Sequence, residues 1–329
     1  MKTKWIAAIL SVCLLMSAAL MLSSCDNGIV TSTYDDASKY RAGAFTYSAT
    51  TVKSITVEWY SGAITVVEGE NSTLSVSESG EALDEAHQLH YFLREDGALF
   101  IRFWESGLRD KIDEAQKHLT VEIPQNVDVT LLSTTADINL HDLQTARALV
   151  TSHSGNINIA AMMAKSLDVS STSGEVSLSD VTTAEAITVT GISGDVAANA
   201  VSGKSISVNA TSGKVAIDEL NMTDKGRIAT VSGDITVHGA KTHSMEVHTT
   251  SGKTELALSA YDTVVVDATS GEVYLTLPEG VGTTVYWKTV SGSLHTEKEH
   301  TSALHNGYHF GTGEKVVRVE TVSGSLHID

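Results

Sequence analysis

A serine-glycine pair recurs at an almost constant interval through the second half of this 329-residue chain. From Gly155 to Gly292, successive glycines are separated by 19, 20, 19, 20, 19, 19 and 21 residues. Ala136 extends the register one step upstream, and Gly324 closes it after a longer gap. The repeat glycines are Gly155, Gly174, Gly194, Gly213, Gly233, Gly252, Gly271, Gly292 and Gly324. A fixed period of this length is typical of a stacked repeat, in which each unit buries its apolar face only against its neighbours.

Apolar residues surround each glycine with the spacing of β-strands. They stand two and four positions after the glycine, and a second alternating pair precedes it by seven and five positions. Spacing by two is strand periodicity, and β-branched residues dominate where a helix would need apolar residues at i, i+3 and i+4. The sequence therefore predicts an all-β fold, a single-chain β-solenoid (β-helix). Each rung, one circuit of the chain, has 19–20 residues and five inward side chains.

Each predicted rung turns at its serine-glycine pair. Glycine permits backbone geometries that a Cβ would hinder, and the adjacent serine can bond the turn's own backbone. The residue after the glycine points outward, and its charge alternates over Asp195, Lys214, Asp234, Lys253 and Glu272. We therefore expect stacked rungs to form a ladder of opposite charges that sets their register. The recurrent acidic ligands and glycine-rich nonapeptide of a calcium-binding β-roll are missing.

The N-terminus has the features of an export signal. Lys2 and Lys4 precede an uncharged apolar run at 6–22, and Leu22-Ser23-Ser24-Cys25 resembles the lipobox of bacterial lipoproteins. The pattern predicts a lipoprotein signal peptide at 1–24, with Cys25 carrying the lipid. An uncleaved anchor helix and ordinary signal cleavage are the alternatives. We expect an extracytoplasmic body, lipid-anchored to the cell membrane.

Charge and cysteine usage agree with this location. The only cysteines are Cys13, inside the signal, and Cys25, so the mature body would have no disulfide. The formal net charge is −18, and removal of Lys2 and Lys4 with the signal leaves −20. Such an acidic surface makes nucleic acid and anionic lipid headgroups poor partners, so the expected membrane contact is through the N-terminal lipid alone.

The remaining chain divides by its pattern. Residues 25–44 are predicted to be a tether, 45–132 an irregular N-terminal β region and cap in which the solenoid starts, and 133–329 the regular solenoid. Charged stretches at 81–90 and 105–118 favour a helical turn or two. A surplus of about 12 residues between Gly292 and Gly324 predicts an inserted loop at 296–314. The chain stops just after its last strand, so the final edge should be bare unless this loop folds over it.

No residue stands out as catalytic, cofactor-binding or metal-binding. The histidines form two groups, His238, His243 and His248, and His295, His300, His305 and His309, but their spacing matches no zinc-ligand pattern. The serines of the serine-glycine pairs are turn residues by their period, and no nucleophile motif occurs. Polysaccharide-cleaving enzymes on parallel β-helices remain the enzymatic alternative, although Arg227 and Arg318 are the only arginines after Arg147.

The signal, the strand-rich region ending in Leu119-Thr120-Val121-Glu122-Ile123-Pro124 and the tandem Thr-x-Ser-Gly units together resemble a bacterial cell-envelope family of unknown function, the "putative adhesin" family. The resemblance implies a β-solenoid in an envelope setting and supplies no catalytic residue. We therefore expect a non-catalytic binding or structural module, adhesin-like, whose partner is an envelope protein or glycan. A modulator or sensor subunit in envelope stress signalling and a carbohydrate-active enzyme are the alternatives.

Overall fold

The computed structural model describes residues 29–70, 73–80, 84–111, 116–303, 307–311 and 314–329. The chain divides into two compact units, Met1–Val176 and Ser177–Asp329, and each is considered by itself. Among the described residues the regular structure is β-strand, apart from two 3₁₀ turns, η1 (Ala37–Lys39) and η2 (Ala49–Thr51). The predicted all-β solenoid is confirmed.

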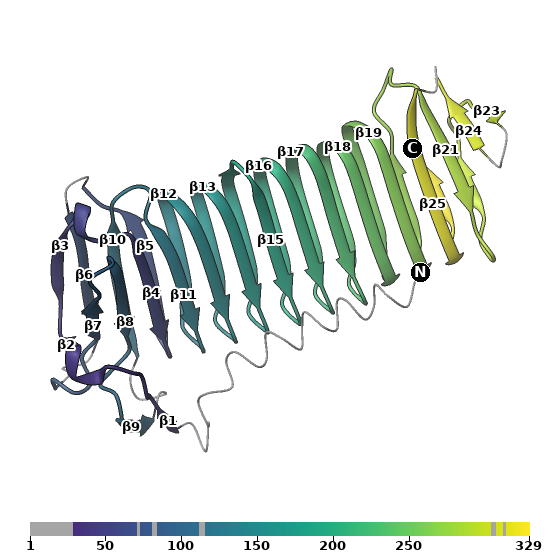
Figure 1. Cartoon of the computed structure of the whole chain (residues 1–329). Helices are drawn as coiled ribbons and strands as arrows, with labels where there is room; N and C mark the ends of the chain where they lie inside the picture. Colours follow the sequence, from purple (N-terminus) through teal and green to yellow (C-terminus); the bar gives the residue numbers. More distant parts are fainter. Residues whose placement is uncertain (1–28, 71–72, 81–83, 112–115, 304–306, 312–313) are drawn as a thin grey trace. The chain divides into compact units, whose positions relative to one another are not determined.

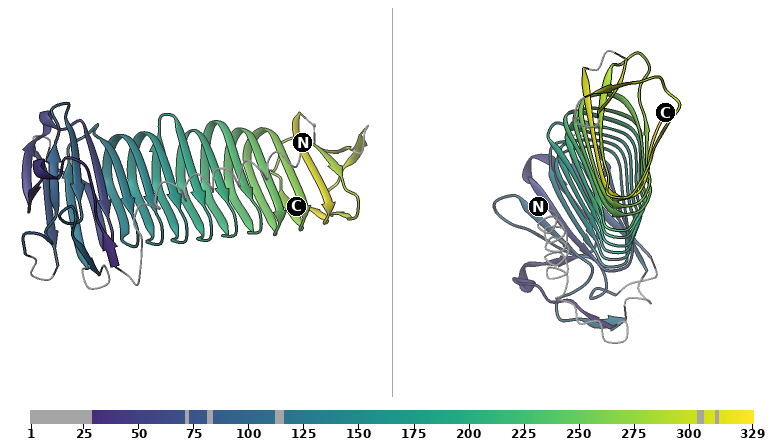
Figure 2. Two further views of the ribbon diagram at one scale, coloured as in Figure 1. Left: turned by 60° about the horizontal axis from the view of Figure 1, so that its bottom comes forward. Right: turned by 90° about the vertical axis from the view of Figure 1, so that its right-hand side faces the viewer.

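The second unit shows the rungs most clearly. It begins within β14 (Val176–Thr183) and continues through β15 (Ala186–Gly191), β16 (Val196–Ala210), β17 (Val215–Thr230), β18 (Ile235–Ser251) and β19 (Thr254–Ser270). β16 to β19 lie side by side in parallel, each paired with the next at an offset of one rung (Figure 1). In the end-on view of Figure 2, the circuits of this unit nearly superpose. Equivalent residues of successive rungs therefore stack on one another.

The core contains more positions per rung than the alternation predicts. In the rung after Gly213, the expected Val215 and Ile217 are buried, and Leu220 and Met222 are buried as well. The phase changes because the residue six positions after the corner residue is left-handed in six consecutive rungs, from the rung of Ala136 to that of Gly233. This residue is Asp142 (φ 51°) and Ala161 (φ 49°) in the first unit, and Asp180 (φ 53°), Ala200 (φ 53°), Glu219 (φ 57°) and Gly239 (φ 66°) in the second. A left-handed residue turns the strand, so inward side chains resume three positions on instead of two.

In the first unit, the first rung of the chain lies between two later rungs. β4 (Ser54–Trp59) pairs in parallel with β8 (Ala98–Arg102) on one side and with β11 (Asp128–Ser133) on the other. β5 (Gly62–Glu68) lies in the same way between β10 (Lys117–Ile123) and β12 (Asp137–Ser152). β12 then pairs with β13 (Ile157–Ser171) at an offset of 19 residues.

Antiparallel strands cover the outermost rung of this unit. β6 (Thr73–Ser79) pairs with β10 and with β3 (Phe45–Ser48), while β7 (His90–Leu93) pairs with β8 and with β2 (Arg41–Ala42). β1 (Ile29–Thr31) and β9 (Arg109–Lys111) form a separate two-stranded sheet. Because these strands run against the rungs they meet, they end the parallel stack and cover its open edge.

The predicted tether at 25–44 is wrong for its described part. Residues 29–44 contain β1, η1 and β2 and pack onto the first unit. The Tyr34 hydroxyl donates to the Trp104 carbonyl over 3.0 Å, and the Tyr34 N–H donates to Ser106 Oγ over 3.1 Å. The composition of this segment suggested a solvated linker, but its tyrosines bury ring surface against other aromatic side chains.

At the end of the second unit, as in the first unit, the rungs do not stack in the order of the sequence. β19 pairs in parallel with β25 (Lys315–Ser323), and β25 pairs in parallel with β21 (Thr283–Lys288). β26 (Leu326–Ile328) likewise lies between β20 (Val273–Thr276) and β22 (Leu294–Thr296). The expectation of a bare final edge is therefore wrong, since the last rung of the chain has a partner on both sides.

The predicted loop at 296–314 is also wrong, because its described part contains two strands. β24 (Gly307–Phe310) pairs antiparallel with β21, and β23 (Thr301–Ala303) pairs antiparallel with β24. Of the helical turns expected at 81–90 and 105–118, the described residues contain one: the Asp84 carbonyl accepts the N–H groups of both His87 and Gln88 over 3.1 Å. The rest of the two described stretches is not helical. His90 begins β7 and Arg109–Lys111 forms β9, because pairing with β8 and β1 outweighs a weak helical propensity.

Candidate functional site

The repeat glycines lie where neighbouring rungs approach most closely. A Cβ built on Gly213 would lie 2.0 Å from the carbonyl oxygen of Gly194, and one on Gly233 would lie 1.9 Å from that of Gly213. The same collision recurs at Gly155, Gly174, Gly252, Gly271, Gly292 and Gly324, each against the residue stacked next to it. Only Gly252, Gly271 and Gly324 of the repeat glycines have a left-handed or strained positive φ. Contact between rungs, more than backbone conformation, explains the glycine.

In several corners, a hydroxyl three positions before the glycine closes the turn. Ser152 Oγ donates to the Gly155 carbonyl over 2.7 Å, and Ser171 Oγ donates to that of Gly174 over 2.6 Å. Both serines are buried, so these bonds satisfy polar groups that water cannot reach. The serine next to the glycine bonds elsewhere: Ser212 Oγ donates to the Ile192 carbonyl of the neighbouring rung over 3.2 Å. The expected bond to the turn is therefore made by the serine three positions before the glycine and not by the adjacent serine.

The outward residue after the glycine joins rungs through its side-chain oxygen. Asp195 Oδ1 accepts the Lys214 backbone N–H over 2.8 Å, and Asp234 Oδ1 accepts that of Lys253 over 2.8 Å. In the first unit Asp137 Oδ1 does the same for Asn156 over 2.8 Å. The Lys253 ammonium pairs with Glu255 over 2.8 Å. Register is therefore held by carboxylate-to-amide bonds in place of the predicted ladder of opposite charges.

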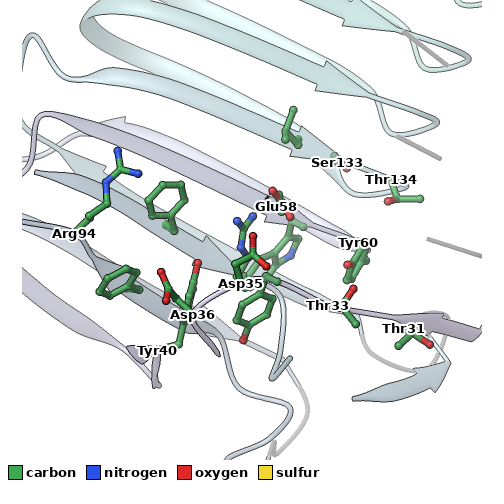
Figure 3. A pocket seen from close by; sticks show the side chains of 16 residues that line it. Thr31, Thr33, Asp35, Asp36, Tyr40, Glu58, Tyr60, Arg94, Ser133 and Thr134 are labelled. Atoms are coloured by element: carbon green, nitrogen blue, oxygen red, sulfur yellow. Dashed lines mark ion pairs between the residues drawn. The ribbon is translucent and has the colours of Figure 1, made fainter. Parts of the chain in front are cut away.

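A pocket of about 570 Å³ opens in the first unit between residues 31–40 and the strands β4, β7 and β8. Figure 3 shows the side chains that surround it. Its lining residues are Thr31, Thr33, Tyr34, Asp35, Asp36, Tyr40, Glu58, Trp59, Tyr60, Phe92, Arg94, Phe100, Arg102, Leu132, Ser133 and Thr134. A pocket of this volume is in the range of small-molecule sites.

Aromatic rings form one wall of this pocket. The rings of Tyr34 and Tyr40 are 4.5 Å apart between centroids, and those of Tyr40 and Phe92 are 5.5 Å apart. These three side chains and Phe100 are half-buried, so part of each ring remains exposed. The sequence signal for this wall was the concentration of aromatic residues in the first third of the chain, but their meeting depends on the fold of residues 31–40.

Most of the charged groups around the pocket are held in ion pairs. Arg102 pairs with Glu58, Lys39 pairs with Asp36 over 3.0 Å, and Arg94 makes a two-pronged contact with Asp96 at 2.8 and 2.5 Å. Burial is the largest single influence on the pKa of Arg102 and lowers it, but the charge of Glu58 and the contacts with Tyr40 together raise the pKa above its ordinary value. Burial raises the pKa of the Tyr34 hydroxyl, which therefore remains a neutral donor.

The histidine groups do not converge. His238, His243 and His248 all lie in β18, and each contacts a carboxylate of a neighbouring rung: His238 that of Asp218 over 3.0 Å, and His248 that of Asp267 over 3.2 Å. His295 stacks on His327, with ring centroids 4.8 Å apart. Across the described ranges, no three histidine, cysteine, aspartate or glutamate residues are grouped to hold a metal ion.

The remaining predicted site residue, Cys25, lies outside the described residues, as do the predicted signal peptide at 1–24 and His305. In the part of the chain that the structure describes, no helix has the length and apolarity needed to cross a membrane.

Two solved structures resemble this chain. One is described as a "putative cell adhesion protein" from Clostridium sporogenes, with 11% identity, a TM-score of 0.24, and coverage of 88% of this chain and 99% of that one. The other is described as a "putative adhesin" from Parabacteroides merdae, with 12% identity, a TM-score of 0.34, and coverage of 88% of this chain and 96% of that one. A search of curated proteins finds no match.

The Toastrack DUF4097 model matches residues 48–190 and again residues 164–329. Together the two matches cover residues 48–329, which include parts of both units. The chain therefore belongs to the Toastrack DUF4097 family.

Proposed function

We propose that this chain is a non-catalytic, adhesin-like binding module, held outside the cell by a lipid on Cys25. The pocket of the first unit carries the proposal. It combines half-exposed aromatic rings with polar groups at its rim, which is the usual composition of a site that recognises a ligand. The acidic surface and the lipobox-like Leu22-Ser23-Ser24-Cys25 support a location at the envelope surface.

The arrangement of acids around the pocket favours binding over hydrolysis. Glycoside hydrolysis needs two carboxyl groups on either side of the scissile bond, one to donate a proton and one to attack or to activate water. Here Glu58 is paired with Arg102 and Asp36 with Lys39. Both carboxyl groups are therefore engaged by a cation, and neither is free to face the other across a bound glycan.

Binding of envelope material by the full-length protein tests the proposal. The protein is incorporated into liposomes, and its retention of purified cell-wall glycan and of solubilised envelope protein is measured beside empty liposomes. We expect retention of one of the two, and a loss of that retention in the Tyr40→Leu variant.

Two outcomes would replace the proposal with an alternative. Release of reducing sugar from the glycan would make the chain a carbohydrate-active enzyme. Stable co-purification of a membrane kinase or transporter would make it a modulator or sensor subunit, provided that glycan is not retained and that Tyr40→Leu leaves the retention of envelope protein unchanged.

A further inference from the structure

We propose that the pocket of the first unit takes a neutral saccharide, with a sugar ring stacked on the aromatic wall formed by Tyr34, Tyr40 and Phe92. This inference deepens the proposed function and rests on it, since that function leaves open whether the ligand is glycan or protein. Four features of the pocket carry it: the exposed ring surface, the balance of charge, the hydrogen-bonding groups at the rim, and the rigidity of the segment that holds Tyr34 and Tyr40.

The aromatic wall offers apolar surface at the scale of a sugar ring. Its three rings follow one another at centroid distances of 4.5 and 5.5 Å, and their planes are tilted by 48° at both steps. A pyranose has one face of C–H groups and a rim of hydroxyls, so it can cover an exposed aromatic ring while its hydroxyls stay hydrated or bonded. Aromatic side chains contribute large contact area at low conformational cost.

The balance of charge selects against ionic ligands. The Lys39 ammonium lies 5.6 Å from the Phe92 ring centre, and the Arg102 guanidinium lies 5.6 Å from that of Tyr34. A cationic ligand would have to displace these groups from the rings they already contact. An anionic ligand would find Lys39, Arg94 and Arg102 already paired with carboxylates. A neutral ligand needs neither a free cation nor a free carboxylate, and it can stack on the parts of the rings that remain exposed.

The rim provides partners for hydroxyl groups. Asp35 is exposed at the pocket, and Thr33 lies beside it on the same segment (Figure 3). Thr134 enters from the corner after β11. Carboxylate oxygens accept, and threonine hydroxyls both donate and accept, which matches the mixed donor and acceptor character of a sugar rim.

The segment that carries Tyr34 and Tyr40 is fixed before any ligand binds. The Tyr34 hydroxyl and N–H donate to Trp104 and Ser106, and Ser106 Oγ donates back to the Tyr34 carbonyl over 3.3 Å. The Gly107 N–H donates to the Ser32 carbonyl over 2.6 Å. A preorganised wall lowers the entropic cost of binding, which matters for a ligand that offers only weak individual contacts.

Titration calorimetry on the full-length protein tests the inference, in a detergent whose headgroup is not a sugar. The neutral probes are chitohexaose, cellohexaose and maltohexaose, the anionic probe is oligogalacturonate, and the cationic probe is choline. We expect at least one neutral probe to bind, and the two charged probes not to bind. Tyr40→Leu should weaken that binding by about tenfold or more, because it keeps apolar bulk but removes the ring. Tyr40→Phe should retain it within about threefold, which separates stacking from loss of the hydroxyl.

Tyr274→Leu is the matched control, since Tyr274 is a half-buried ring of the second unit that stacks on His327 at 4.5 Å. It should bind as the unaltered protein does. The inference is overturned if no neutral probe binds, if a charged probe binds better, or if Tyr40→Leu and Tyr274→Leu behave alike. Retention of envelope protein by liposomes, with no binding of any saccharide, would leave the proposed function standing and remove this inference alone.

Discussion

At most of the corners that carry a repeat glycine, a side chain of any size would collide with the carbonyl oxygen of the rung stacked against it. The ideal Cβ positions of Gly155 and Gly213 lie 2.0 Å from such an oxygen, far below any permitted contact. The rungs are joined there by parallel strand pairing on both sides, so the backbone cannot move away without breaking hydrogen bonds. The glycine is therefore required by the stacking of rungs.

Gly213→Ala should destabilise the second unit by more than about 2 kcal/mol, because overpacking against backbone cannot be relieved by a rotamer change. Gly226→Ala is its control. A Cβ on Gly226 would have only side-chain atoms near it, the closest being Leu220 Cδ2 at 3.7 Å. We expect that variant to be neutral or slightly stabilising. Chemical denaturation measures both, and equal losses in the two variants would contradict the steric explanation.

The carboxylate of Asp195 should stabilise the second unit through the backbone N–H of Lys214, which it accepts over 2.8 Å. Asp195→Ala is expected to cost about 1 kcal/mol, and Asp195→Asn, which keeps an acceptor oxygen, much less. Lys214→Glu should have little effect, since the contact uses the main chain of Lys214. Thermal unfolding at low and high salt provides the comparison. A large, salt-sensitive loss of stability in Lys214→Glu would show instead that the ladder of opposite charges holds the register.

In the first unit, segments outside the regular repeat are joined to the rungs by hydrogen bonds and ion pairs of a few side chains. Lys117 of β10 is buried, pairs with Glu78 of β6 over 2.8 Å, and donates to the His87 carbonyl over 2.8 Å. Burial lowers its pKa to about 8, despite the nearby carboxylate. His87 in turn lies between Asp84 at 2.6 Å and Asp110 of β9 at 3.1 Å. These contacts join segments far apart in the sequence.

The His87 bridge predicts a pH dependence. Its hydrogen bond to Asp84, and secondarily that to Asp110, raises the pKa of His87 above the ordinary 6.5, although burial opposes the shift. A raised pKa in the folded state means that the bridge is fully stabilising below pH 6.5 and is lost as pH rises through the folded pKa. The difference in unfolding free energy between the unaltered protein and His87→Gln should therefore shrink from pH 5.5 to pH 8.

Tryptophan fluorescence suits this measurement, because Trp104 is buried and its ring lies 6.2 Å from that of His87. Denaturant titrations at several pH values between 5.5 and 8 give the two curves. Curves that remain parallel over the whole range would show that the imidazole acts by packing alone.

The order of the last rungs can be tested by cross-linking. Lys288 of β21 pairs in register with Glu320 of β25, whose other neighbour is Asp267 of β19. Cysteines at 288 and 320 should form a disulfide under mild oxidation, because adjacent strands are about 4.8 Å apart. Cysteines at 288 and 267, two strands apart, should not. With Cys13 and Cys25 replaced by serine, mass spectrometry identifies the product. The reverse result would mean that rungs stack in sequence order.

At the scale of the whole molecule, acidity and the N-terminus determine the expected setting. A net charge of −18 opposes contact with anionic surfaces, so the proposed attachment to a membrane depends on the N-terminal segment. One acyl chain binds a membrane weakly, and stable anchoring needs two or more, as a lipidated N-terminal cysteine would provide.

Cys25→Ala should therefore abolish incorporation of labelled palmitate and move the protein out of the membrane fraction or leave its signal uncleaved. Metabolic labelling followed by fractionation detects either result. Cys13→Ala, inside the predicted signal, is the control and should be labelled like the unaltered protein. Labelling that survives Cys25→Ala would remove the lipid anchor from the proposed function.

The sequence alone determined the solenoid, because a buried position that recurs every 19 or 20 residues can be satisfied only by rungs in register. It located the glycine corners for the same reason, since each glycine repeats a local demand. The sequence did not show the two further core positions, which Leu220 and Met222 occupy in their rung. These positions follow a left-handed residue whose type varies from rung to rung, for example Ala200 in one and Glu219 in the next, so no sequence pattern marks it.

Only the tertiary structure decided where the stack of rungs ends in each unit and where the pocket of the first unit lies. Strand pairing between β25 and both β19 and β21 depends on contacts between segments distant in the chain, and repeat spacing does not encode the order in which rungs stack. The same holds for Tyr34 and Tyr40, whose segment has the composition of a linker. Their burial against β7 and β8 is a property of the folded surface, which no local pattern of residues specifies.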